Sequence, residues 1–379
     1  MNIDDVRLAR AYLSRVAEPF AGALSGLVTE VGPVEAAALV RAGEVSPSVL
    51  SQTSARRAVE LAEEDLQRIR ARGGRLIIPE DEEWPRWPFV SLGVANGHRR
   101  CGGEPLALWV RGEHDLSEVA DRAVAVVGSR DASGYGQHVA TELAHGLALA
   151  GVAVVSGAAY GIDGAAHRGA LGGGGVTVAV LACGPDIAYP AGHQGLLTTI
   201  ARDGLVVSEY PPGVTPARHR FLTRNRLIAA LGTGTVVVEA GRRSGAKNTA
   251  ATTVALGRVL MVVPGPVTSA SSTGCNELLR SGDAVPVSSV AEIVESVGRF
   301  GDDLVEPVRD KRSDLGAPQG DAMRVYEALG LRSGHSPEVI SVESGVELGR
   351  VRALLPELEL AGLACRGEEG WRRLEPSFG

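Results

Sequence analysis

The chain has 379 residues, with 38 Lys and Arg against 45 Asp and Glu, and a formal net charge of −7. This acidic balance excludes a protein that coats DNA with its whole surface, so any nucleic-acid site must be local. The sequence has no apolar run of about 18 residues, which excludes a transmembrane helix, and its four scattered cysteines form no zinc or disulfide pattern. Met1–Arg10 lacks the apolar core of a signal peptide, and a reducing cytoplasm is the expected compartment.

Residues 1–71 are predicted to form an N-terminal helical domain of the helix-hairpin-helix or SAM-like kind. Helical apolar spacing occurs in Val6–Val16, Val34–Arg41 and Ser54–Arg70. The glycines between the first two segments suit either a turn that contacts a DNA backbone or a plain three- or four-helix bundle. The plain bundle is the favoured interpretation.

Residues 72–298 are predicted to form a Rossmann-like α/β core. Leu76–Pro79 and Leu106–Val110 are expected to extend its sheet, with turns around Trp84 and Trp87 and with these tryptophans in the core. From Ala123 onward, Val-rich runs alternate with helical segments, a pattern typical of a doubly wound parallel sheet. The expected strands are Val124–Val127, Val152–Val155, Val176–Leu181, Leu205–Val207, Thr235–Val238 and Val259–Val263. The expected helices are Tyr135–Ala150 (capped by Ser133), Ile162–Leu171, Gln194–Arg202, Arg224–Leu231 and Ala246–Leu256.

Residues 299–320 are charged, contain Pro and Gly, and are predicted to be a linker. Residues 321–379 show three helical segments and a hairpin, which indicates a winged helix. This segment carries seven Arg against ten Asp or Glu. Because duplex reading requires a basic face, a protein contact or a structural role is favoured for it.

The stretch Arg218–Lys247 carries the strongest local charge. It contains seven basic residues and one acidic residue, Glu239, and Phe221 lies among the arginines. Such a run is often a solvated surface. However, Arg224 and Arg226 are expected at the start of an apolar helix, where the dipole would favour acids. Arginines that hold phosphates beside an aromatic ring that stacks on a base are typical of single-strand binding.

Two loops are expected to add backbone N–H groups to this site. Gly128-Ser129-Arg130 follows the first strand of the alternating region, and Gly157 follows the next. Glycine allows backbone to approach an anion closely, and a helix start adds a favourable dipole. With the arginines and Lys247, both loops are expected to converge over the carboxyl ends of the strands.

Asp163 and His167 are four residues apart on a predicted helix. That spacing suits a metal pair or an acid–base pair. An ordinary intrahelical contact is the favoured interpretation, and the sequence predicts neither a metal nor a cofactor.

The order of these motifs closely resembles the bacterial DNA-processing protein family DprA (also called Smf). The resemblance covers about residues 70–297. It rests on Val127–Arg130, Ser156–His167, Tyr189-Pro190, Ser208–Gly213, Phe221–Arg226, Val238–Ala240, Ser244–Ala250 and Val263–Gly265. Leu222 departs from the pattern, because the family usually has proline there.

The resemblance implies a mediator and not an enzyme. The family binds single-stranded DNA without sequence preference, protects it during natural transformation, loads the recombinase RecA onto it and forms homodimers. The DNA-binding residues that the resemblance and the loop pattern indicate are Gly128, Ser129, Arg130, Gly157, Arg218, Phe221, Arg224, Asn225, Arg226 and Lys247.

Two alternatives belong to other classes. Gly232–Thr235 and Glu239 superficially resemble the loop and carboxylate of Rossmann-like enzymes that hydrolyse nucleoside monophosphates, and such an enzyme would place Glu239 in a pocket. A nucleotide-sensing protein that signals through the winged helix is the other alternative. The segment Phe221–Arg226 favours the DNA-binding interpretation over both.

Overall fold

The computed structural model describes residues 2–94, 102–298, 320–331, 333–367 and 370–374. The chain divides into two compact units, Met1–Leu304 and Val305–Gly379. Within the described ranges, none of the helices is long and apolar enough to cross a membrane.

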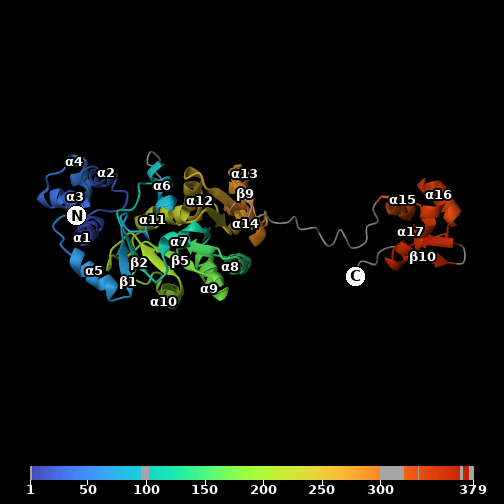
Figure 1. The fold of residues 1–379 in the computed structure, drawn as a ribbon, viewed down its shortest axis with the longest axis horizontal. Coiled ribbons are helices and arrows are strands. Elements are labelled where there is room, and N and C mark those ends of the chain that lie inside the picture. Colours follow the sequence, from blue (N-terminus) through green and yellow to red (C-terminus); the bar gives the residue numbers. More distant parts are fainter. Residues whose placement is uncertain (1, 95–101, 299–319, 332, 368–369, 375–379) are drawn as a thin grey trace. The chain divides into compact units, whose positions relative to one another are not determined.

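A nine-stranded sheet forms the centre of the first unit in the described part of the chain, with the order β1-β2-β6-β5-β4-β3-β7-β8-β9 (Figure 1). Neighbouring strands from β6 to β9 are parallel, whereas β1 and β2 extend the sheet with antiparallel pairing. The parallel sheet and its N-terminal extension therefore confirm the prediction. The strands are β1 (Gly74–Ile77), β2 (Leu108–Arg111), β3 (Ala123–Val127), β4 (Ala153–Ser156), β5 (Thr177–Leu181), β6 (Leu205–Ser208), β7 (Gly234–Val237), β8 (Val259–Val262) and β9 (Ala284–Pro286).

Helices cover both faces of this sheet (Figure 1). One face packs against α6 (Arg86–Val94), α7 (Leu116–Asp121), α11 (Arg218–Leu231), α12 (Ala246–Ala255) and α13 (Thr273–Arg280). The other face packs against α8 (Gly134–Leu149), α9 (Ile162–Gly172), α10 (Gln194–Asp203) and α14 (Val290–Val297). This arrangement confirms the Rossmann-like, doubly wound fold. The Ser133 side chain accepts a hydrogen bond from the Gly136 N–H at 3.0 Å, so the predicted cap of α8 is also confirmed.

Five helices precede the sheet, namely α1 (Ile3–Val16), α2 (Gly22–Val31), α3 (Pro33–Ala42), α4 (Pro47–Thr53) and α5 (Ala62–Arg70). They share one apolar core with Leu76, Ile78 and Trp109 of the antiparallel extension. The predicted single helix Ser54–Arg70 is wrong. The Tyr12 hydroxyl donates to the Arg57 carbonyl at 2.7 Å, and this tertiary contact holds the segment between α4 and α5 in turns.

The region around Trp87 also differs from the prediction, because Arg86–Val94 form a helix where turns were expected. Trp84 is buried and meets Phe89 edge-on with ring centroids 5.2 Å apart, and Trp109 is buried as well. Trp87 is 80% exposed, so its predicted place in the core is wrong.

The second unit contains α15 (Asp321–Glu327), α16 (Pro337–Ser344) and α17 (Leu348–Leu360), followed by the hairpin β10 (Ala364–Gly367) and β11 (Gly370–Arg373). Val325, Ile340, Val351 and Trp371 contribute to its own apolar core. Three helices followed by a hairpin are the winged-helix order that the sequence predicts. The predicted linker lies outside the described residues except for Gly320.

Candidate nucleic-acid interface

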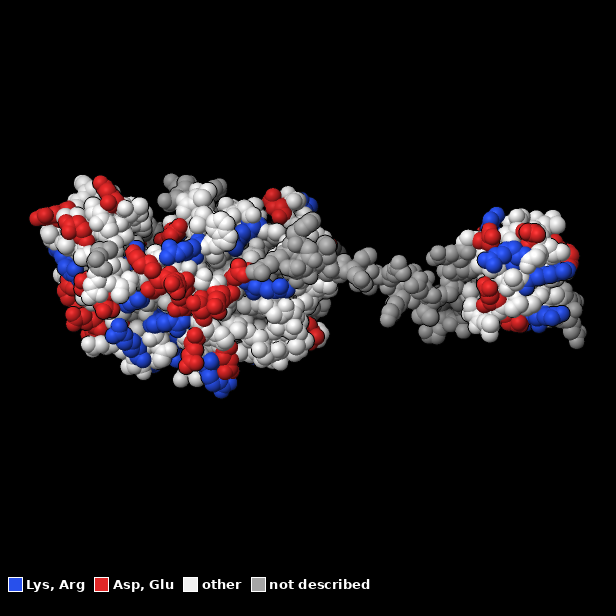
Figure 2. Space-filling view, viewed as in Figure 1, with Lys and Arg blue, Asp and Glu red and all other residues white. Residues whose placement is uncertain are grey.

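A cavity of about 780 Å³ lies over the carboxyl ends of β3, β4 and β7. Its described lining contains four arginines, Arg130, Arg218, Arg224 and Arg243, against two acidic residues, Asp131 and Asp163. Figure 2 shows a band of Asp and Glu across one face of the first unit, in keeping with the acidic total. The basic lining is therefore a local feature, and it lies at the edge where doubly wound sheets bind ligands.

An aromatic pair beside an arginine forms one wall of the cavity. The rings of Phe221 and Tyr189 lie 5.3 Å apart between centroids with their planes tilted by 42°. The guanidinium carbon of Arg130 lies 5.1 Å from the centroid of Phe221. Arg130 is exposed and Tyr189 is 40% exposed. Flat apolar surface next to an accessible cation can take a base and its phosphate together.

Arg224 lines the same cavity but is almost completely buried. Its Nη1 donates to the carbonyls of Gly157, at 2.8 Å, and Val180. Burial lowers the pKa of Arg224 to about 10, partly offset by the nearby Asp163 carboxylate. Arg224 therefore lines the cavity from a buried position and is held there by two carbonyls, whereas Gly157 itself is absent from the described lining.

Arg226 and Lys247 are directed to other partners. Arg226 is 1% exposed, and its Nη2 donates to Glu209 Oε1 at 2.5 Å. Lys247 donates to Glu277 Oε2 at 2.7 Å. Neither belongs to the described lining of the cavity, whereas Gly128, Ser129, Arg130, Arg218, Phe221, Arg224 and Asn225 do.

The backbone N–H groups of the loops are already used within the protein. Ser129 donates its N–H to the carbonyl of Glu239 at 2.7 Å, and Ile162, at the start of α9, donates to the carbonyl of Ser129 at 3.1 Å. The N–H of Ser133 donates to the Glu239 carboxylate at 2.9 Å. Of these three residues only Ser129 belongs to a predicted anion-binding loop, and its N–H is taken up by the Glu239 carbonyl.

The helix that carries Phe221 is longer than predicted. Because α11 begins at Arg218, Arg224 and Arg226 lie inside it and not ahead of its first turn. The sequence contains the reason at Leu222. A proline in that interior position would lack an N–H and clash with the preceding turn, whereas leucine permits a continuous helix.

Asp163 and His167, which were predicted to contact each other along a helix, have different partners in the structure. Asp163 lines the cavity, and burial raises the pKa of its carboxyl. His167 is fully buried, with its Nδ1 2.7 Å from Thr177 Oγ1. Since Thr177 donates its hydroxyl hydrogen to the Val154 carbonyl, His167 Nδ1 must be the donor to Thr177. These hydrogen bonds indicate a structural role for His167.

The cavity residues missing from the predicted DNA-binding set include Tyr189, His219 and Arg243. Arg243 was recognisable as part of the basic stretch. Tyr189 lies 32 positions before Phe221, and its pairing with that ring depends on the tertiary fold.

Glu239 is buried and is absent from the described lining of the cavity. Its carboxylate accepts hydrogen bonds from the Ser133 N–H and hydroxyl, at 2.9 and 2.7 Å, and from the Ser271 hydroxyl at 2.7 Å. A nucleotide hydrolase would need Glu239 in the pocket, and the structure does not place it there. Its carboxylate instead binds Ser133 at the start of α8.

Comparison with known proteins places this architecture in a family. The family model of DNA recombination-mediator protein A matches residues 75–298. The chain belongs to this family, known as DprA. A putative DNA processing protein DprA of Mycobacterium tuberculosis is 53% identical over 378 residues, covering 100% of this chain and 97% of the relative. The Escherichia coli protein Smf is 36% identical, covering 71% of this chain and 72% of the relative.

The fold is also similar to a solved DprA structure. The X-ray structure of DprA from Streptococcus pneumoniae is 28% identical with a TM-score of 0.64, covering 79% of this chain and all of that chain. These relatives support a DNA-processing role for the family fold. The cavity described above lies entirely within the part of the chain that the family model matches.

Proposed function

We propose that this protein binds single-stranded DNA without sequence preference in the cavity over β3, β4 and β7. The observation that carries the proposal is the wall made by Arg130, Phe221 and Tyr189. Aromatic faces accept any base, and the surrounding arginines hold phosphates, so neither feature selects a sequence. The DNA-processing names of the relatives support the same class of ligand.

The proposed DNA-binding set is Gly128, Ser129, Arg130, Tyr189, Arg218, Phe221, Asn225 and Arg243, together with the buried Arg224, which the Gly157 carbonyl holds in place. Arg226 and Lys247 are left out because each is already paired with a glutamate.

On the family resemblance, the protein also protects the bound strand and loads RecA during recombination or natural transformation. It acts in the cytoplasm as a homodimer and as a mediator without catalysis. RecA loading is a separate step, which an assay of strand exchange in the presence of a competing single-strand-binding protein would test.

The direct test is fluorescence anisotropy of labelled single-stranded and duplex oligonucleotides over a salt series. Wild-type protein binds the single strand more tightly, and its affinity falls with salt because phosphate contacts release counterions. Arg130→Ala lowers the affinity, whereas Arg202→Ala is a matched control, because the Arg202 side chain is exposed on α10 and pairs with Asp203. Absence of single-strand binding at low salt would contradict the proposal.

A further inference from the structure

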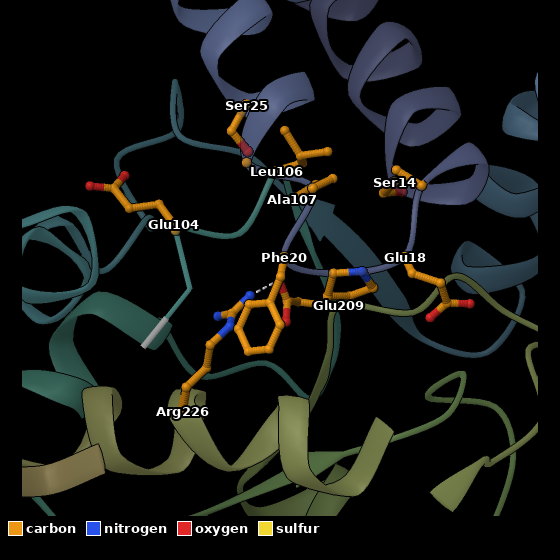
Figure 3. Close-up of a pocket in the computed structure, with 14 residues that line it drawn as sticks. Ser14, Glu18, Phe20, Ser25, Glu104, Leu106, Ala107, Glu209 and Arg226 are labelled. Carbon is orange, nitrogen blue, oxygen red and sulfur yellow. Dashed lines mark hydrogen bonds and ion pairs between the residues drawn. The ribbon is translucent and has the colours of Figure 1, made fainter. Parts of the chain in front are cut away.

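The segment Ala17–Ala21 joins α1 to α2 and reaches across to α11, the helix that carries Phe221 (Figure 3). It contacts α11 through Arg220 and Arg226. Both are absent from the described lining of the DNA cavity, whereas Phe221, Arg224 and Asn225, which lie between them, belong to it. The segment also approaches His219, which lines the cavity, but its contacts with Arg220 and Arg226 hold the helix from outside the cavity.

The first contact is an ion-pair cluster around Glu18. Arg220 Nη2 donates to Glu18 Oε1 at 2.5 Å, and Arg56 Nη2 donates to the same oxygen at 2.9 Å. His219 Nε2 lies 3.7 Å from Glu18 Oε2. Burial alone would raise the pKa of Glu18, but its hydrogen bonds and charge interactions with Arg220 and Arg56 lower it overall, so the carboxylate is charged near neutral pH.

The N-terminus of helix α11 has no negative charge of its own and depends on one from another segment. In the described structure its N-cap, Ala217, makes no side-chain hydrogen bond, and its first turn contains no acidic residue. The turn instead carries Arg218 and Arg220, whose positive charge opposes the helix dipole. Glu18 supplies the negative charge that the helix itself lacks. Arg220 also donates to the Thr215 carbonyl at 2.6 Å, so the same side chain joins Glu18 to the loop ahead of the helix.

The second contact is at Arg226, six residues after Arg220 and so about 9 Å further along the helix. The guanidinium carbon of Arg226 lies 5.1 Å from the ring centroid of Phe20. Figure 3 shows this ring beside Arg226 and Glu209, between the segment and α11. Phe20 adopts a φ of 76°, a strained value for a residue with a side chain, which persists only when the surroundings fix it.

We propose that Glu18 is a positioning residue for DNA binding. It fixes the first turn of α11 and so holds Arg218 and Phe221 in their places at the cavity. This inference rests on the proposed single-strand binding, and it assigns the N-terminal helices a role in ordering that site. In this role the N-terminal helices order the site without touching the DNA.

The test compares Glu18→Gln with wild type by anisotropy of a labelled oligothymidylate. Glu60→Gln is the matched control, because in the described structure Glu60 pairs with Arg41 in the N-terminal region and not with a residue of α11. The positioning role predicts binding weaker by about fivefold or more for Glu18→Gln and unchanged binding for Glu60→Gln. Simple electrostatics predicts the opposite sign, since removal of a negative charge near the cavity favours an anionic ligand.

A double-mutant cycle with Phe221→Ala separates positioning from general loss of structure. If Glu18 acts through the first turn of α11, its replacement has a much smaller effect once Phe221 is absent. Should Glu18→Gln fail to fold, Arg220→Gln breaks the same ion pair from the other side, and the same loss of affinity is expected with an unchanged salt slope.

The outcomes are distinct. Wild-type protein that binds no single strand overturns the proposed function itself. Wild-type protein that binds while both Glu18→Gln and Arg220→Gln bind equally well or more tightly overturns the positioning role alone.

Discussion

The guanidinium of Arg224 occupies the space that a side chain at residue 157 would need. A Cβ built on Gly157 would lie 2.4 Å from Arg224 Nη1, and that same nitrogen donates to the Gly157 carbonyl at 2.8 Å. The glycine after β4 therefore serves a buried arginine. The other role expected of this glycine, which is to let backbone N–H groups approach an anion, stays a prediction.

Gly157→Ala is expected to displace Arg224 from its two carbonyl acceptors. Because buried groups left without partners destabilise the fold, the free energy of unfolding falls by about 1–3 kcal/mol. Urea unfolding measures it. Gly134→Ala is the control, since a Cβ there meets nothing within 4 Å. Equal stability of both variants would contradict this account of Gly157.

Arg130→Ala is expected to weaken single-strand binding and to reduce the magnitude of the log–log salt slope by about 0.7, the value for one phosphate contact. Phe221→Ala is expected to weaken binding by about 1–3 kcal/mol, the value of one stacked base, with the slope unchanged. Anisotropy titrations at several salt concentrations distinguish the two effects. A slope change in the phenylalanine variant would contradict its assignment as a stacking residue.

Arg226→Ala is expected to act on stability. It leaves Glu209 buried without its cationic partner, which destabilises the fold by about 3–5 kcal/mol. Thermal and urea unfolding provide the measurement, and the double variant Arg226→Met with Glu209→Gln should recover part of the loss. For any folded Arg226 variant, the salt slope of DNA binding stays that of wild type. A lower slope would return Arg226 to the set of phosphate contacts.

His167 makes the stability depend on pH. Burial, with smaller contributions from His193, Arg224 and Arg168, lowers the pKa of His167 to about 3. The unfolded chain therefore binds a proton at this residue below about pH 6.5 that the folded chain does not bind. The contribution of His167 to the free energy of unfolding is fully present above about pH 6.5. It falls by about 1.4 kcal/mol per pH unit as the pH decreases toward 3. His167→Asn should have a shallower profile in urea unfolding between pH 7 and 4, and parallel profiles would contradict the assignment.

The parallel strands were predictable because each is a buried Val-rich run, and buried strands of this kind carry their own signal. Their order in the sheet and the pairing of β2 with β6 depend on contacts between distant segments. The short edge strand β9 has two exposed residues and contains Pro286, which is uncommon within strands, so no comparable signal marked it. The break between α4 and α5 depends on the hydroxyl of Tyr12, which no local pattern contains.

The candidate site shows the same division. Composition identified the basic stretch, and most of its proposed residues meet in one cavity. However, charge alone does not indicate which basic side chains are available to bind DNA. Arg226 and Lys247 are neutralised by Glu209 and Glu277, residues 17 and 30 positions away in the chain. Tyr189 was recognised as part of a motif, but only the fold brings its ring to Phe221.

The strand order has a consequence for synthesis of the protein. The central strand β3 pairs on one side with β4, its neighbour in the chain, and on the other with β7, which begins at Gly234. The cavity spans this junction and takes part of its wall from Ala246 and Thr249. Because a chain leaves the ribosome from its N-terminus, the first half of the sheet emerges well before the wall is complete. On the proposed function, the DNA-binding cavity of a nascent chain is therefore incomplete until α12 has emerged and docked.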